Sequence, residues 1–371
     1  MLQKALRITD ELVEHRRWLH AHAETGFDLH QTANYVCRQL EDMGYLPRRV
    51  GRCGVIADHS RREGPTILLR ADMDALPIQE KTGAAYASNH PGCMHACGHD
   101  GHMSILLELA RRLSRKQSLS HNVLLIFQPG EESPGGAKAI CDTGLLAKYK
   151  VKATFGLHLW PGLEAGKVFS RCHELMARSA EVNVDLYGKS SHIAKASQGI
   201  DALMAGAEFY TRAMEMEGSL PAEVYRLLKF GKFQSGTVRN ALSAHTHMEG
   251  SLRAFQDDVF EEMAGSLRRI GREMEEKYGC KVEIYIAQGY PAIWNPEDLF
   301  AKVMACVPVE TLEEPSMTSE DFSCYQRVAP GMFFFLGLGD TPALHADTFD
   351  FDESILLKGA DFFEALAEKF Q

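Results

Sequence analysis

Six side chains that can bind a metal ion lie close together in residues 92–103. The segment reads Gly-Cys-Met-His-Ala-Cys-Gly-His-Asp-Gly-His-Met. Its potential ligands are Cys93, His95, Cys97, His99, Asp100 and His102. Gly98 and Gly101 allow tight turns of the backbone, so alternate side chains can converge. A polar loop with buried cysteines and surface histidines is the simpler explanation, but this many ligand types in one turn-rich segment favour a metal site.

Further acidic and imidazole side chains follow three apolar segments that we predict to be buried strands. These segments span residues 66–70, 123–127 and 153–157. They are followed, in turn, by Asp72 and Asp74, by Glu131 and Glu132, and by His158. Open α/β sheets bind their ligands at the carboxyl ends of the strands. We therefore expect these side chains at one edge of a sheet, near the cysteine and histidine segment.

These residue types suit metal-assisted hydrolysis. Cys97 and His99 supply an anionic and a neutral ligand two positions apart, and a thiolate has enough lone pairs to bridge two ions. A hydrolytic site keeps a coordination position open for water. The adjacent carboxylates suggest a division of labour, in which Glu132 or Glu131 binds metal and its neighbour acts as general base.

Composition narrows the class of protein. The chain has 371 residues, so we expect two domains, or one large α/β unit with an insertion. A net charge of −10 argues against a nucleic-acid partner, because no concentrated basic face is available to phosphates. No apolar segment is long enough to span a bilayer, and the N-terminus has no signal-peptide core, so we expect a cytoplasmic protein.

The middle of the chain has the pattern of a separate small domain. Alternating strands and amphipathic helices follow in the order β-α-β-β-α-β between residues 176 and 288. The flanking parts, residues 1–175 and 289–371, are expected to form one catalytic domain. Its predicted helices include residues 2–23, 32–43, 103–113 and 136–146.

A second group of possible ligands lies on a strand of the small domain. His245, His247 and Glu249 alternate within residues 244–252 and therefore share one face. A half-exposed strand face with polar side chains explains this pattern better than a second metal site.

The motifs occur in the order typical of a known family. They are Arg70-Ala-Asp-Met-Asp-Ala-Leu-Pro, Met94-His-Ala-Cys-Gly-His-Asp-Gly-His, Phe127-Gln-Pro-Gly-Glu-Glu, Gly156-Leu-His and Leu344-His-Ala-Asp-Thr-Phe-Asp-Phe-Asp-Glu. Over nearly the whole chain, the sequence resembles the amidohydrolase branch of the dimetal aminoacylase/carboxypeptidase metallopeptidase family. That branch includes indole-acetyl-amino-acid hydrolases, hippurate hydrolases and N-acetyldiaminopimelate deacetylases.

The resemblance implies an α/β fold and a cofactor. The expected fold is a zinc-peptidase-like catalytic domain, with a mixed sheet and flanking helices, interrupted by a ferredoxin-like βαββαβ lid or dimerisation domain. The implied cofactor is two divalent metal ions per subunit, Mn²⁺ or Zn²⁺, with Ni²⁺ or Co²⁺ as further options.

The resemblance also implies roles for single residues. The implied metal ligands are Cys97, His99, Glu132, His158 and His345. Cys97 would bridge, Glu132 and His345 would hold one ion, and His99 and His158 would hold the other. Glu131 matches the general base, and Asp74 matches an aspartate that orients a ligand imidazole.

Three residues of the small domain match positions that face the substrate: His192, Asn240 and Arg253. Arg253 could bind the carboxylate of an amino acid, although a surface ion pair would also explain it. Two features depart from the family pattern. Ser190-Ser191 replaces two glycines beside His192, and Gly130 stands where alanine is common.

We therefore expect a metal-dependent amidohydrolase that cleaves an N-acyl amino acid, N-acetyl or aryl-acyl, into a carboxylate and a free amino acid. A homodimer formed through the lid domain is expected, with no nucleic-acid or membrane partner. The alternatives are a dipeptidase or carboxypeptidase of the same fold, a non-catalytic metal-dependent binding protein, and a hydrolase with Cys97 as nucleophile.

Overall fold

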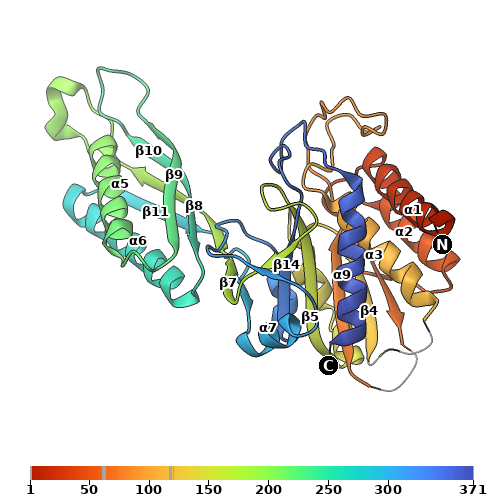
Figure 1. Cartoon of the computed structure of the whole chain (residues 1–371). Helices are drawn as coiled ribbons and strands as arrows, with labels where there is room; N and C mark the ends of the chain where they lie inside the picture. The colour runs from red at the N-terminus through yellow and green to blue at the C-terminus, as the bar shows by residue number, and fades with distance from the viewer. Residues whose placement is uncertain (1, 61–63, 117–118, 120, 371) are drawn as a thin grey trace. The chain divides into compact units, whose positions relative to one another are not determined.

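The computed structural model describes residues 2–60, 64–116, 119 and 121–370 (Figure 1). The chain divides into two compact units. The larger unit comprises Met1–Leu175, Trp294–Glu314 and Asp321–Gln371, and the smaller comprises Met176–Ile293 and Pro315–Glu320. The smaller unit thus extends past residue 288, where the sequence placed its end, and takes in a later segment whose Thr318 carbonyl accepts a hydrogen bond from Ala177 N at 2.8 Å.

The larger unit is built on a mixed sheet. Within the described residues its strand order is β1-β2-β4-β3-β5-β14-β6-β13. The strands are β1 (Arg48–Val50), β2 (Gly54–His59), β3 (Thr66–Asp72), β4 (Asn122–Gln128), β5 (Val151–Trp160), β6 (Val168–Ser170), β13 (Glu310–Thr311) and β14 (Gly331–Gly337). A separate two-stranded sheet pairs β7 (His173–Met176) with β12 (Ile293–Asn295).

The central strands are parallel and buried, as their continuous apolar sequences predict. Every residue of β3, β4 and β14 is buried. Strand β3 pairs in parallel with β4 on one side and with β5 on the other, and β5 pairs in parallel with β14. Because these neighbours run in the same direction, their carboxyl ends lie at one edge of the sheet.

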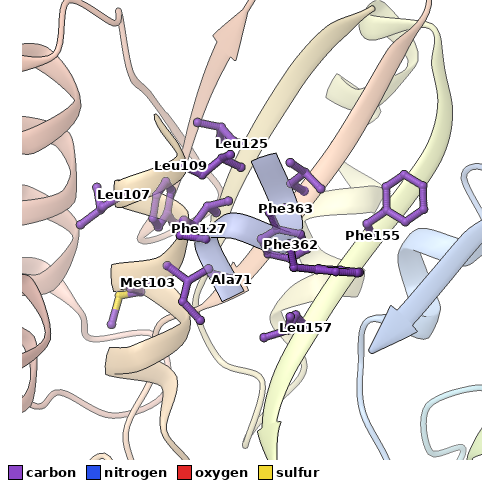
Figure 2. Close-up of a cluster of buried hydrophobic side chains, with 14 of the residues drawn as sticks. Ala71, Met103, Leu107, Leu109, Leu125, Phe127, Phe155, Leu157, Phe362 and Phe363 are labelled. Atoms are coloured by element: carbon purple, nitrogen blue, oxygen red, sulfur yellow. The ribbon is translucent and has the colours of Figure 1, made fainter. Parts of the chain in front are cut away.

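Helices cover the sheet of the larger unit. They are α1 (Leu2–Ala21), α2 (His30–Asp42), α3 (His99–Ser114), α4 (Gly136–Asp142), α7 (Glu297–Met304), α8 (Ser323–Gln326) and α9 (Leu356–Lys369), with 3-10 turns at Leu145–Tyr149 and Glu353–Ile355. Helix α3 packs against α1, α2, α9 and the central strands. Figure 2 shows side chains of this core, including Leu107 of α3, Phe127 of β4, Phe155 of β5 and Phe362 of α9.

The smaller unit has the predicted order of elements. Its elements are β8 (Arg178–Tyr187), a 3-10 segment (Ile193–Gln198), α5 (Ala202–Ser219), β9 (Arg226–Ser235), β10 (His245–Ala254), α6 (Asp257–Tyr278) and β11 (Lys281–Ile286). The antiparallel sheet has the order β11-β8-β10-β9. Alternate residues such as Val182, Val184 and Leu186 form a core with α5 and α6, while the residues between them point to the opposite face. Among the described residues, no helix is both long and apolar enough to cross a membrane.

Candidate dimetal centre

The metal-ligand segment is a loop that leads directly into helix α3. Gly98 is the N-cap, in the left-handed conformation with φ of 82°, and the helix starts at His99 rather than at the predicted residue 103. Gly101 therefore forms no turn of its own. A Cβ atom at Gly101 would lie 2.6 Å from Leu159 Cδ1, so this glycine lets α3 approach β5 closely. Gly98 supplies the turn, and Gly101 supplies the space.

The five predicted metal ligands come together in the larger unit. Their donor atoms form two groups, each within 4.8 Å, and both groups contain the Cys97 thiol. One group is Cys97, His99 and His158, and the other is Cys97, Glu132 and His345. Cys97 Sγ lies 3.4 Å from His158 Nε2 and 3.3 Å from His345 Nε2. This arrangement fits two ions that share one bridging thiolate.

The sheet brings these side chains together from distant parts of the chain. His158 lies near the end of β5, and Glu131 and Glu132 follow the end of β4. Parallel pairing through β3 places these strand ends at the same edge. His345 has a positive φ of 66°, and its backbone N–H donates to Ala96 O at 2.8 Å. That hydrogen bond ties the segment of His345 to the segment of Cys97.

Hydrogen bonds at Nδ1 orient two of the imidazoles so that Nε2 is the nitrogen left on the side of the other predicted ligands. His99 Nδ1 donates to Asp74 O at 2.7 Å, and His158 Nδ1 donates to Leu159 O at 2.6 Å. His99 Nε2 is buried and has no hydrogen-bond partner among the described residues. A buried nitrogen without a partner is costly, and a metal ion would satisfy it.

The electrostatics of the site also favour cations. Burial, together with the charges of Glu132 and Glu131, raises the pKa of the Cys97 thiol well above its usual value, so a thiolate there requires nearby positive charge. Burial opposes a charge on His99, but Asp72 and Asp74 outweigh it and raise its pKa to about 10. Carboxylates that favour a proton at this point also favour a metal ion. Thiolate, imidazole and carboxylate donors together fit divalent transition metals.

Asp74 contacts the site through both its carboxylate and its main chain. Its carboxylate accepts the backbone N–H of Glu131 at 2.9 Å and that of Glu132 at 3.1 Å. The imidazole of His99 donates to the main-chain carbonyl of Asp74 at 2.7 Å, and the same Nδ1 lies 3.6 Å from the Asp74 carboxylate. The carboxylate therefore fixes the turn that carries the two glutamates in addition to facing the His99 imidazole, and the main chain of the same residue accepts the hydrogen bond of that ring.

His102, which received no role from the sequence, positions the end of β5. Its Nδ1 donates to Asp72 Oδ1 at 2.5 Å, and its Nε2 accepts the N–H of Leu159 at 2.9 Å. Both ring nitrogens are therefore used in hydrogen bonds. Leu159 directly follows the ligand His158, so His102 acts on the ligand set through the backbone of β5. This role depends on tertiary contacts that the motif spacing does not reveal.

Asp100, His95 and Cys93 lie outside the two donor groups described above. Asp100 Oδ2 accepts hydrogen bonds from Arg16 Nε at 2.9 Å and from His20 Nδ1 at 2.8 Å, within a buried cluster. His95 is 1% exposed, and neither of its ring nitrogens has a hydrogen-bond partner among the described residues. The thiol of Cys93 donates to Ala23 O at 3.2 Å.

The departure at Gly130 has a physical explanation. Gly130 has a φ of 70°, a conformation that favours glycine. A Cβ atom there would lie 2.9 Å from Cε1 of Phe27. The Phe27 ring therefore occupies the space that an alanine methyl group would need, immediately before Glu131.

The three predicted substrate residues belong to the smaller unit. His192 and Asn240 are exposed, and His192 Nδ1 accepts the N–H of Ala194 at 3.1 Å. Ile193 N donates to Asn240 O at 2.9 Å, so these two residues lie in adjoining loops. The guanidinium of Arg253 donates to the Met317 carbonyl and to Ser251 Oγ.

Comparisons with known proteins agree with this fold. Residues 68–369 match the model of peptidase family M20/M25/M40. An N-acetyldiaminopimelate deacetylase of Limosilactobacillus reuteri is 33% identical over 372 residues, which cover 95% of this chain and 96% of the relative. An uncharacterized hydrolase of Staphylococcus saprophyticus is 32% identical over 373 residues, with 97% of each chain covered. The crystal structure of the Bacillus subtilis YXEP protein, a dinuclear metal binding peptidase from the M20 family, has a TM-score of 0.85 at 31% identity, with 97% of each chain covered.

The fold and the site define a metal-dependent hydrolase of linear amides with a dinuclear centre. The chain belongs to peptidase family M20/M25/M40. The resemblance seen in the motifs and the predicted class of fold are thereby confirmed.

Proposed function

We propose that the chain hydrolyses the amide bond of an N-acyl amino acid, N-acetyl or aryl-acyl, to a carboxylate and a free amino acid. The observation that carries this proposal is the Glu131 carboxylate, which lies within 4.8 Å of donor atoms of His99 and Glu132. A protein that only bound metal would have no need of this additional buried carboxylate. Relatives named N-acetyldiaminopimelate deacetylase support an acylated amino acid as substrate.

The proposed ligands of the two ions follow from the two donor groups. Cys97 would bridge, with Glu132 and His345 on one ion and with His99 and His158 on the other. Mn²⁺ and Zn²⁺ are the first candidates, and Ni²⁺ and Co²⁺ suit the same donors. When bound, the two cations polarise the scissile carbonyl and lower the pKa of a water molecule.

Glu131 is the proposed general base and then the general acid. Its carboxylate accepts a proton from the attacking water as the new C–O bond forms, and it returns that proton to the amine nitrogen as the C–N bond breaks. The Asp74 carboxylate, which binds the Glu131 N–H at 2.9 Å, holds the base in position for both transfers. Glu131 is only 8% exposed, which limits competing exchange of the proton with bulk water.

Residues of the smaller unit are proposed to contact the substrate. His192 would stabilise the oxyanion, and Asn240 would bind the substrate near it. Arg253 would bind the amino-acid carboxylate, because a guanidinium binds carboxylates in a bidentate geometry. The hydrogen bonds of Arg253 to Met317 O and Ser251 Oγ leave donors available for this interaction.

We also propose a homodimer formed through the smaller unit. Strand β9 is at the edge of the sheet, and exposed edges favour pairing with another chain. The Phe233 side chain on β9 is 41% exposed and lies against Tyr210 of α5, with ring centroids 6.4 Å apart. Leu203 and Met204 of the same helix are 49% and 59% exposed. Replacing Phe233 with aspartate should shift the chain from dimer to monomer in light scattering, and a wild-type chain that is already monomeric would contradict the proposal.

A substrate panel tests the proposed reaction. The metal-loaded enzyme should hydrolyse N-acetyl amino acids, N-acetyldiaminopimelate or hippurate with a higher kcat/KM than matched dipeptides. Replacing Arg253 with methionine should lower kcat/KM about 10–100-fold, the effect of losing a hydrogen-bonded charge pair. Arg268 of α6 is exposed, and its replacement with methionine is the matched control. Faster turnover of dipeptides would instead indicate a dipeptidase.

A further inference from the structure

Two histidines and an aspartate meet on the open face of the smaller sheet. Strand β10 pairs with β8 in antiparallel register, with His247 directly opposite Asp185. His245 lies two positions away on β10 and therefore points to the same face. The residues between and beyond them, Thr246 and Met248, are buried on the other face. The register thus brings together ligand types from strands that are far apart in the sequence.

The three side chains converge on one point. His245 Nε2 lies 2.7 Å from Asp185 Oδ1, and His247 Nδ1 lies 2.8 Å from the same oxygen. Each residue offers one donor atom, and these atoms lie within 4.8 Å of one another. Two imidazole nitrogens and one carboxylate oxygen form the donor set of the 2-His-1-carboxylate type, which leaves further coordination positions for water.

Neighbouring residues fix the orientation of both rings. The Tyr187 ring stacks on His245, with centroids 4.9 Å apart and an interplanar angle of 14°. His247 Nε2 donates to Glu249 Oε1 at 2.8 Å, and Lys232 Nζ binds the same oxygen at 2.6 Å. Glu249 therefore orients the ring from its far side, as carboxylates do beside metal-bound histidines. Asp185 is the carboxylate that faces both rings.

The cluster is open to solvent and to a cavity. The side chains of His245, His247 and Asp185 are 48%, 24% and 24% exposed. Both histidines line a cavity of about 460 Å³, together with residues such as Gln234 and Ser243. A hydrated cation can therefore reach the three donors and keep water molecules as its remaining ligands.

We propose that Asp185, His245 and His247 form a third metal site, separate in its residues from the dimetal centre and selective for divalent transition metals such as Zn²⁺. Two imidazole donors favour these ions over Mg²⁺ and Ca²⁺, which prefer oxygen ligands. When the ion binds, each ring nitrogen that faces Asp185 gives up its proton, to solvent from a protonated ring or to the other ring nitrogen of a neutral one, and donates its lone pair. The ion links the two central strands of the sheet, β8 and β10.

The spacing of His245, His247 and Glu249 had favoured a solvated strand face over a metal site. In that pattern Glu249 is the carboxylate beside the two histidines. In the structure Glu249 binds the far nitrogen of the His247 ring and pairs with Lys232. The ligand carboxylate, Asp185, comes from another strand. The proposal is independent of the proposed substrate and of the proposed general base.

Zinc stoichiometry of the full chain tests this site. After chelation and removal of the chelator, Zn²⁺ is titrated in competition with a chromophoric chelator. The wild-type chain should bind three equivalents, and the double variant H245A/H247A should bind two while its hydrolytic activity is unchanged. His30 is an exposed histidine of the larger unit, and H30A is the matched control that should keep three equivalents.

Two further variants keep the test decisive. The milder replacement H247Q should weaken the third equivalent at least tenfold if the double variant does not fold. A variant of the dimetal centre, C97A/H99A, should retain the equivalent that H245A/H247A loses, which distinguishes this site from a failure of the dimetal centre. The proposal is overturned if the wild-type chain binds only two equivalents, or if the third persists unchanged in H247Q and in the double variant.

Discussion

Replacing Asp74 with alanine tests how the turn that carries the two glutamates is held. The Asp74 carboxylate accepts two backbone hydrogen bonds, at 2.9 Å and 3.1 Å, and hydrogen bonds to a charged acceptor contribute about 1.5–3 kcal/mol each. Both bonds would be lost in D74A. Mutation of a residue that hydrogen-bonds to a metal ligand without binding the metal itself typically lowers metal affinity or activity about 10–100-fold. We therefore expect a loss in kcat of about 100-fold and a weaker metal affinity, since one bond holds Glu131 and the other holds Glu132.

The assay measures both quantities on the same preparation. Hydrolysis is followed at a saturating metal concentration, where both metal positions are filled. The loss in kcat that remains under these conditions reflects the displacement of Glu131. Metal affinity is measured by chelator competition, which reports on Glu132. Asp28 is an exposed aspartate with a side chain 78% exposed, and D28A is the matched control that should change neither quantity. If D74A retained wild-type kcat and metal affinity, the carboxylate would not position the turn.

Two further predictions concern local packing and pH. The variant G130A should lower the stability of the larger unit by about 1–3 kcal/mol, because the new Cβ would sit at a positive φ and in close contact with Phe27. In a double-mutant cycle, the second change F27A should recover the part of this loss that is due to the contact. Burial opposes a charge on His20, but its hydrogen bond to Asp100 and its ion pair with Glu80 raise its pKa from 6.5 to about 9. The stabilisation that this proton contributes is complete below pH 6.5 and is lost as the pH rises through about 9. Unfolding monitored by tryptophan fluorescence should therefore show a lower free energy of unfolding at pH 10 than at pH 7. The variant H20Q should reduce that difference.

The parts of the fold that follow from local patterns were predictable. Continuous apolar sequence indicated the buried strands β3, β4 and β5, and alternation indicated the smaller sheet. The expectation that the chemical groups gather at the carboxyl ends of neighbouring strands is confirmed by the parallel pairing of β3 with both neighbours, although Asp72 and His158 lie within β3 and β5 rather than after them. These features follow from the periodicity of apolar residues and from the direction of the strands, both of which can be inferred from a sequence.

Features that depend on tertiary contacts were not predictable. Helix α3 was expected to start four residues late, because the ligand residues in its first turn do not have the apolar pattern of a helix. Gly101 was assigned to a turn, although its role is to admit Leu159. The sequence pattern groups His247 with His245 and Glu249 of its own strand, whereas the register with β8 also supplies Asp185. In the last two cases the deciding residue lies far away in the sequence.

The most direct test of the proposed mechanism is the variant E131Q, compared with the wild-type chain for metal content and for turnover. Glutamine keeps the size of the side chain but cannot accept and return a proton at neutral pH. We predict that E131Q binds the same two ions at the dimetal centre, while kcat falls about 10²–10⁴-fold, the usual contribution of a general base. Turnover comparable to wild type with the metals in place would contradict the assignment of Glu131 as the base.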